Sequence, residues 1–162
     1  MSTGNQHTTR REFIKRTSAG IAAAGFAIAP GRVLGANEKI RMGIIGVGDR
    51  GSWGMRESIK QGAETIAVCD VYETRLNAAI ERAGEMQNGR KPKSYKEFRK
   101  LLENKDIDAV FVGTPDHWHH DMLIASVQAG KDVYQEKPFS KTIEQGKNMV
   151  KEVRKTDRIV QI

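Results

Sequence analysis

The stretch RMGIIGVGDRG, residues 41–51, decides how the rest of the chain is interpreted. An apolar run ends in three glycines, Gly46, Gly48 and Gly51, with the spacing G-x-G-x-x-G. In a dinucleotide-binding unit the first glycine permits a tight turn and the second lets a pyrophosphate approach the main chain. The third lets the following helix pack close to the strand. The same spacing also occurs in flexible turns, so its meaning depends on the elements around it.

Those elements alternate between strand and helix patterns. Continuous apolar runs predict buried parallel strands at residues 40–47, 64–69, 108–112, 132–135 and 159–162. Helical periodicity predicts helices at residues 51–61, 73–85, 95–102, 116–129 and 142–155. In the last helix the inward side chains are expected to be Ile143, Gly146, Met149, Val150 and Val153. This rhythm predicts an α/β fold with a doubly wound parallel sheet, whose ligands bind at the carboxyl ends of the strands.

The glycine loop therefore lies between a predicted strand and a predicted helix. Backbone amides near Asp49 and Arg50 would face phosphates at the favourable end of the helix dipole. Asp70 closes the next strand, where a carboxylate accepts hydrogen bonds from ribose hydroxyls and repels a 2′-phosphate. This predicts NAD as the cofactor, with NADP as the alternative because Arg75 lies close behind. The structural alternative for Asp70 is a helix cap or a loop charge.

The composition limits the other classes of function. The 162 residues suffice for one domain with a substantial core. The net charge of +7 divides into +4 over residues 1–36 (five cations, one anion) and +3 over the remainder. There is no basic stripe with interleaved aromatic residues, which argues against nucleic-acid binding. Cys69 is the only cysteine, which excludes an internal disulfide and a cysteine-based metal site and indicates a small apolar side chain in a strand.

Residues 1–36 are expected to be a leader outside the fold. A charged segment, TTRREFIKR (8–16), precedes an apolar stretch of small residues (19–29) that is too short to span a bilayer comfortably. Five residues resemble the twin-arginine export signal S/T-R-R-x-F-x-K: Thr9, Arg10, Arg11, Phe13 and Lys15. That resemblance implies export of the folded protein to the periplasm by the twin-arginine machinery. A disordered basic tail is the alternative, and the mature domain is expected to comprise residues 37–162.

Two further segments follow strands at the edge where the ligand is expected. They are GTPDHWHH (113–120) and AGKDVYQEKPFS (129–140). Together with the glycine loop they resemble the Gfo/Idh/MocA family of NAD(P)-dependent oxidoreductases, over essentially all of residues 39–162. The resemblance implies a Rossmann fold, oxidation of a sugar or polyol CH–OH group, and frequent homo-oligomers. It also implies a second α/β domain that is absent from this chain, so the chain is expected to bind dinucleotide without turning over substrate.

The resemblance also implies residue roles. It assigns cofactor-binding positions to Thr114, Pro115, His119, Glu136 and Lys137. Lys137 is the implied catalytic residue, because the family lysine positions the substrate hydroxyl and supports proton transfer. The peptide bond before Pro138 is implied to be cis.

The histidines of residues 113–120 have other interpretations. His117, His119 and His120 with Asp116 have the composition of a metal cluster, but His117 and His119 point to different sides of a helix, so no metal site is predicted. His119 is instead expected to contact Asp116 at the start of the helix. Trp118 is interpreted as a packing residue.

Two alternative functions remain open. One branch related to the family hydrolyses glycosides through transient oxidation by a bound NAD. The lysine of EKP tends to be replaced there, so Lys137 argues against this branch. The other alternative is a dinucleotide-binding module without catalytic activity.

Overall fold

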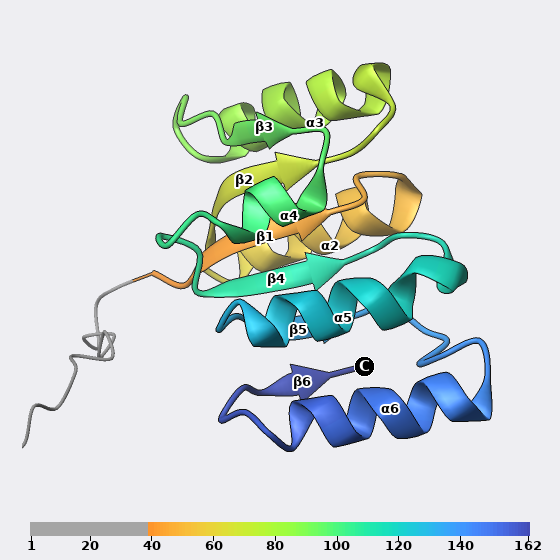
Figure 1. Ribbon diagram of the computed structural model, residues 1–162. Coiled ribbons are helices and arrows are strands. Elements are labelled where there is room, and N and C mark those ends of the chain that lie inside the picture. Colours follow the sequence, from red (N-terminus) through yellow and green to blue (C-terminus); the bar gives the residue numbers. More distant parts are fainter. Residues whose placement is uncertain (1–38) are drawn as a thin grey trace, which may run out of the picture. The chain divides into compact units, whose positions relative to one another are not determined.

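A computed structural model describes residues 39–162, and the expected leader lies outside the described residues. The described chain forms a six-stranded sheet in the order β3-β2-β1-β4-β5-β6 (Figure 1). Every neighbouring pair is parallel. The strands are β1 (Arg41–Ile45), β2 (Glu64–Cys69), β3 (Lys93–Tyr95), β4 (Ala109–Val112), β5 (Asp132–Gln135) and β6 (Val160–Gln161). The predicted doubly wound parallel sheet is confirmed.

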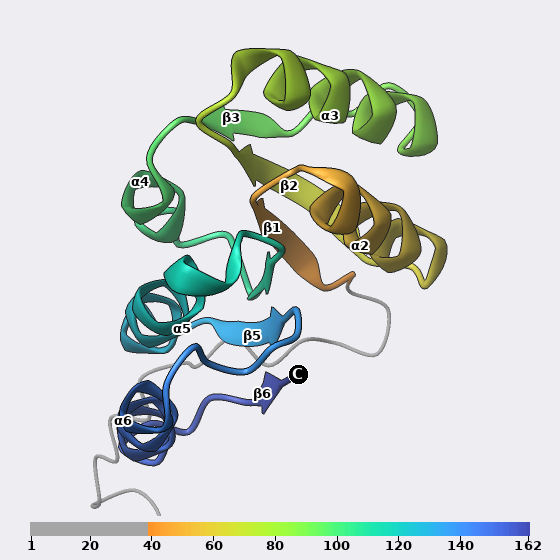
Figure 2. The ribbon, with the colours of Figure 1, turned by 90° about the vertical axis from the view of Figure 1, so that its right-hand side faces the viewer.

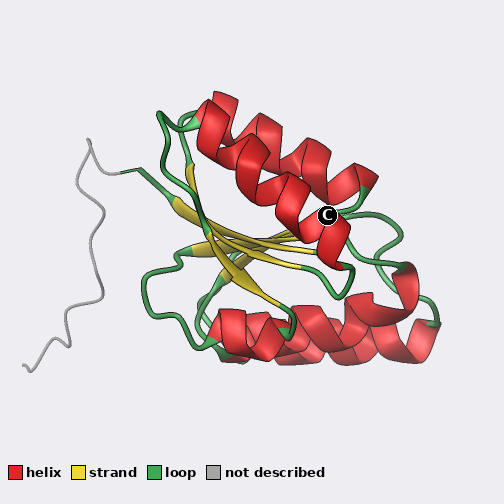
Figure 3. Ribbon diagram, turned by 90° about the horizontal axis from the view of Figure 1, so that it is seen from above, coloured by secondary structure: helices red, strands yellow, loops and turns green. Residues whose placement is uncertain are grey.

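Helices cover both faces of this sheet (Figures 2 and 3). One face carries α2 (Asp49–Lys60) and α3 (Glu73–Met86). The other carries α4 (Phe98–Leu102), α5 (His119–Gln128) and α6 (Ile143–Val153). The strand order reverses between β1 and β4, so the carboxyl ends of these two strands form the switch point at which such sheets bind ligands. No helix among residues 39–162 has the length and apolarity needed to cross a membrane.

The apolar strands build a separate core on each face. Ile44 and Ile45 are neighbours in β1, yet Ile44 packs on the α2–α3 side and Ile45 on the α4–α6 side. Successive side chains of a strand point to opposite faces, and both faces are covered here. This is why β1 is a continuous apolar run rather than an alternating one.

One predicted helix is wrong. Residues 95–102 were expected to be helical throughout, whereas Tyr95 ends the edge strand β3 and the helix begins only at Phe98. The strand reads Lys-Ser-Tyr and is largely exposed, so it has no apolar run to reveal it. Its place is fixed by pairing with β2, Ala67 opposite Lys93, which is a long-range contact.

Other boundaries and faces also differ. The first helix begins at Asp49 instead of residue 51, and the helix expected from residue 116 opens with the 3₁₀ turn η1 (Asp116–Trp118). In α6, Gly146 and Met149 are buried as expected, but Ile143 and Val150 are 73% and 39% exposed. This helix covers the edge of the sheet, where a narrower stripe is buried.

Candidate dinucleotide site

The glycine loop joins β1 to α2 by a very close approach of backbone atoms. A Cβ on Gly51 would lie 1.7 Å from the carbonyl oxygen of Gly46. Gly46 has φ +80°, and a Cβ there would lie 2.7 Å from Cγ2 of Thr114. These two glycines are therefore required by the fold itself.

Gly48 is different, because the space in front of it is not filled by backbone. Its φ of −66° is open to any residue, and the nearest group to a Cβ would be Nη1 of Arg75 at 3.3 Å. Gly48 is also the N-cap of α2 and contributes no side-chain cap. The amides of Asp49 and Arg50 open α2, where backbone N–H groups have no acceptor within the helix and can bind an anion.

Asp70 follows β2 and lies against this loop. One carboxylate oxygen accepts a hydrogen bond from the amide of Val47 at 2.9 Å, and the other accepts one from the amide of Tyr72 at 2.9 Å. Each carboxylate oxygen has a further lone pair available for a ligand hydroxyl. Asp70 is therefore not the cap of α3, whose N-cap is Tyr72, but it binds backbone amides of two loops and also borders the cavity described next.

A cavity of about 390 Å³ lies at the carboxyl ends of β1, β2 and β4. Its lining comes from the glycine loop, the loop after β2, the segment before and within α4, and the loop after β4. The lining includes Gly46, Gly48, Asp70, Val71, Tyr72, Arg75, Phe98, Thr114, Pro115, Trp118 and Met122. Thr114 and Pro115 thus lie beside the glycine loop, where the resemblance places them.

Trp118 corrects one interpretation. It was interpreted as a packing residue, but it is 42% exposed and lines the cavity. It lies in η1, one residue before α5, so it projects from the loop instead of from a buried helix face. Tyr72, Val71 and Phe98 form the other apolar walls and were not singled out from the sequence.

Cys69 lines the floor of the same cavity. Its side chain is 4% exposed, and burial, followed by the nearby Asp70 carboxylate, raises the pKa of its thiol to about 12. The thiol is thus neutral at ordinary pH, in keeping with the small apolar side chain expected from the sequence.

A second hollow of about 270 Å³ lies at the ends of β5 and β6. It is lined by Arg50, Trp53, Tyr134, Gln135, Glu136, Lys137 and Ile162. The buried Glu136 lies 3.8 Å from Nε of Arg50, so the glycine loop and the EKP segment share one ion pair. Lys137 is exposed at the rim, and the Lys137–Pro138 peptide is cis, as the resemblance implied.

Trp53 is a lining residue that the sequence reasoning missed. It is 42% exposed, and its ring lies 5.6 Å from the guanidinium of Arg50. A tryptophan three residues after Arg50 occupies the same face of α2, and this spacing is the signal that could have identified it.

His119 does not contact Asp116, which corrects another expectation. Asp116 pairs instead with His117 at 3.6 Å. The His119 ring is 1% exposed, and its two nitrogens lie 2.7 Å from the carbonyl oxygen of Pro138 and 2.9 Å from that of Thr114. His119 therefore touches both loops of the site but lines neither hollow. Among residues 39–162, no three side chains of metal-binding type are grouped to hold an ion.

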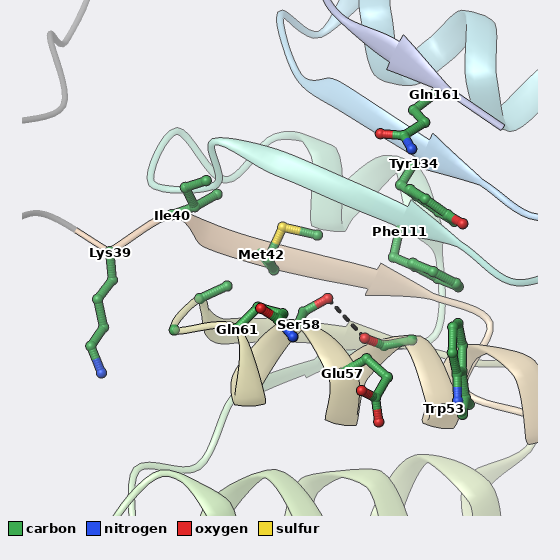
Figure 4. Close-up of a pocket in the computed structure, with 13 residues that line it drawn as sticks. Lys39, Ile40, Met42, Trp53, Glu57, Ser58, Gln61, Phe111, Tyr134 and Gln161 are labelled. Carbon is green, nitrogen blue, oxygen red and sulfur yellow. Dashed lines mark hydrogen bonds between the residues drawn. The ribbon is translucent and has the colours of Figure 1, made fainter.

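A larger hollow, about 800 Å³, shares Trp53 and Tyr134 with the hollow of Glu136 and Lys137 (Figure 4). It is an apolar groove between α2 and the sheet, where the rings of Phe111 and Tyr134 stack at 5.1 Å. Trp53 and Met42 also face it, whereas the three loop glycines do not. Because phosphates need donors, we assign the dinucleotide to the carboxyl ends of the strands and not to this groove.

The residues at that edge fit a dinucleotide. The open surface at Gly48 and the helix amides suit a pyrophosphate, and Asp70 has the position and chemistry to bind a ribose. The Glu136–Lys137 hollow is lined by Arg50, which belongs to the glycine loop and pairs with Glu136.

Comparisons with known proteins identify the family of the chain. The profile described as "Oxidoreductase family, NAD-binding Rossmann fold" (Gfo/Idh/MocA) matches residues 40–162. Glycosyl hydrolase family 109 protein 1 of Shewanella sp. (strain ANA-3) is 31% identical over 173 residues, covering 92% of this chain. The α-N-acetylgalactosaminidase of Shewanella oneidensis is 31% identical over 160 residues, covering 84% of this chain and 35% of its own length. The chain spans 38% of the length of the first of these relatives.

Solved structures share the fold. Myo-inositol dehydrogenase from Lactobacillus casei, in complex with NAD(H) and myo-inositol, has a TM-score of 0.69 at 27% identity, covering 76% of this chain and 36% of its own. The WlbA dehydrogenase from Chromobacterium violaceum, in complex with NADH and UDP-GlcNAcA, has a TM-score of 0.67 at 31% identity, covering 77% and 35%. The chain belongs to the Gfo/Idh/MocA oxidoreductase family, and its residues 40–162 are the NAD-binding Rossmann domain.

Proposed function

We propose that this domain holds NAD for the oxidation of a CH–OH carbon in a sugar or polyol, or for the reverse reduction of the corresponding carbonyl carbon. The observation that carries the proposal is the pair of hollows at the carboxyl ends of the strands, one lined by Gly48 and Asp70 and the other by Arg50, Glu136 and Lys137. The nicotinamide, when bound, supplies the hydride acceptor. The protein's own residues supply binding, orientation and proton handling.

Lys137 is the residue proposed to act on the substrate. Its ammonium lies at the exposed rim of the hollow, where Nζ can donate a hydrogen bond to the substrate hydroxyl oxygen. That interaction would stabilise the negative charge that develops on this oxygen as the hydroxyl proton passes to a base or to solvent and the hydride leaves the carbon. Glu136 and Arg50 hold each other at the inner wall of the hollow and orient the backbone that carries Lys137.

The first test is cofactor binding by the 162-residue chain. Titration with NADH, followed by energy transfer from tryptophan, is expected to show saturable binding, since Trp53 and Trp118 line the two hollows. ADP-ribose should compete. A chain that is folded by circular dichroism but binds neither ligand would contradict the proposal.

The second test concerns the catalytic residue and needs a protein of the relatives' length. In such a protein Lys137→Met is expected to lower kcat for polyol or sugar oxidation by a factor of roughly 10² or more while changing the Kd for NADH by less than about threefold. Lys141→Met is the control, since Lys141 is exposed and lines neither hollow. Equal effects of both substitutions would contradict the role given to Lys137.

A glycoside hydrolase is the second candidate, favoured by the names of the Shewanella relatives. The same NAD site would then oxidise the sugar transiently, and the net reaction would release the aglycone. Lys137 argues against this branch. Release of an aryl alcohol from aryl glycosides by the longer protein, with no net NADH formed, would favour hydrolysis over oxidation.

We also propose that the protein acts in the periplasm, on the basis of the expected leader at residues 1–36. The residues Thr9 to Lys15 resemble a twin-arginine signal, which supports export of the folded domain to the periplasm. The test is a reporter fused after residue 36. Its export is expected to stop when Arg10 and Arg11 are both replaced by lysine, and continued export would contradict the proposal.

A further inference from the structure

His119 connects the two loops that border the site while lying in neither hollow. Nδ1 is 2.7 Å from the carbonyl oxygen of Pro138, and Nε2 is 2.9 Å from the carbonyl oxygen of Thr114. A carbonyl oxygen accepts hydrogen bonds, so a ring nitrogen that carries a proton donates to the carbonyl oxygen that it faces.

The two carbonyls belong to different parts of the site. Thr114 follows β4 and lines the cavity that contains Asp70. Pro138 follows Lys137, which lines the other hollow. One buried ring therefore sets the separation between the loop after β4 and the loop after β5.

The loop after β5 has another anchor, which serves a different purpose. Nε2 of Gln135 donates to the carbonyl oxygen of Phe139 at 2.8 Å, and this bond ties the loop back to its own strand. It leaves the position of the loop relative to Thr114 unspecified. The His119 contacts supply that second constraint.

We propose that His119 is a positioning residue of the NAD site, one that holds the Lys137 segment at the distance from the Thr114 loop that the nicotinamide end of the cofactor needs. The inference rests on the proposed function. It predicts that the bond to Pro138 affects the nicotinamide end alone. The bond to Thr114 affects the part of the site shared by all adenosine-containing ligands.

Two substitutions separate the bonds. Counted from Cβ, the amide nitrogen of asparagine occupies the place of Nδ1, and the amide nitrogen of glutamine occupies the place of Nε2. His119→Asn can therefore keep the bond to Pro138 and lose the one to Thr114, whereas His119→Gln can keep the bond to Thr114 and lose the one to Pro138.

The readout is the affinity of the 162-residue chain for NADH and for ADP-ribose, which lacks the nicotinamide. His119→Gln is expected to weaken NADH about tenfold and to leave ADP-ribose within about twofold. His119→Asn is expected to weaken both ligands by a similar factor, so that their ratio is unchanged. If His119 served stability alone, the ratio of NADH affinity to ADP-ribose affinity would be the same in both variants.

His120→Gln is the matched control. His120 is the next residue of α5, but its nitrogens face Asp121 and Asn148 instead of the two loops, so this variant should bind both ligands like the unmodified chain. An NADH to ADP-ribose ratio that is the same in His119→Gln and in the unmodified chain would overturn the inference alone. If both His119 variants were unfolded, the inference would also be overturned, because His119 would then be needed for folding and not for positioning the loops. Failure of the unmodified chain to bind either ligand would instead overturn the proposed function, and this inference with it.

Discussion

The carboxylate of Asp70 accepts a hydrogen bond from the amide of Val47 at 2.9 Å, so the acid at the end of β2 holds the loop at the end of β1. The two strands are neighbours, with Ile45 opposite Cys69 in the register. The acid therefore fixes the backbone of the glycine loop in the same place where it would bind a ribose. Structural support and ligand recognition share one side chain here.

Replacing Asp70 should change the preference between the two dinucleotides. Asp70→Asn keeps an oxygen that can accept from Val47 but removes the charge that repels a 2′-phosphate, while Arg75 remains in the cavity. We expect the affinity for NADPH to rise about tenfold relative to NADH. Fluorescence titration with both ligands measures this, and the exposed Asp157→Asn serves as control. An unchanged ratio would remove Asp70 as the basis of the NAD preference.

Replacement by alanine should affect a different property at each of two glycines of the loop, stability at Gly51 and NADH affinity at Gly48. Gly51→Ala places a methyl group 1.7 Å from the carbonyl oxygen of Gly46 and is expected to cost roughly 3 kcal/mol of unfolding free energy or more. Gly48→Ala meets only the flexible end of Arg75, and the stability should change by less than about 1 kcal/mol. Its effect should appear in NADH affinity, which we expect to fall at least about tenfold.

Urea unfolding and NADH titration of both variants test this division. The comparison is internal, since each glycine serves as the control for the other. If Gly48→Ala bound NADH as tightly as the unmodified chain, the pyrophosphate could not lie against that backbone.

The sequence predicted those parts of the fold that have a local signal. The apolar runs of β1, β2, β4 and β5 and the spacing of Gly46, Gly48 and Gly51 are visible in the chain itself. The strand β3 carries no such signal, because it is polar and exposed and is fixed only by pairing with β2.

The site shows the same division. Asp70, Thr114, Glu136 and Lys137 could be named from motifs, and each lines one of the two hollows. The partners of His119 could not be named. Pro138 lies 19 residues away, and only the packing of α5 beneath both loops brings it within 2.7 Å. The exposure of Trp118 could not be predicted, because the sequence predicted a helix over residues 116–129 and gave no sign that it opens with the turn η1.

Lys131 should be important for stability although it is far from the ligand. It is 3% exposed, and burial lowers the pKa of its ammonium. Nζ donates to the carbonyl oxygens of Asn104 and Ile107, both at 2.8 Å. Lys131→Met is expected to lower the unfolding free energy by about 2–3 kcal/mol, since it leaves these two acceptors without that donor.

Thermal or urea unfolding measures the effect, with the exposed Lys141→Met as the matched control. NADH affinity of the folded variant should stay within about twofold, because Lys131 lines neither hollow. A stability equal to that of the control would mean that water replaces the lost donor without cost.

Cys69 predicts how stability depends on pH above neutrality. Burial raises the pKa of its thiol from 9.0 to about 12 in the folded chain. Between these values the unfolded chain has lost a proton that the folded chain retains, so unfolding releases a proton and becomes easier as the pH rises. The contribution of the thiol is fully present below pH 9 and is lost toward pH 12, at a limiting slope of about 1.4 kcal/mol per pH unit.

Urea unfolding at pH 8 and pH 10 measures this for the unmodified chain and for Cys69→Ala. The unmodified chain should lose more stability between the two pH values than the alanine variant, which has no thiol to ionise, so that other titrating groups cancel in the difference. Equal losses in the two proteins would show that the folded thiol ionises as readily as the unfolded one, and that it is not shielded beneath the glycine loop.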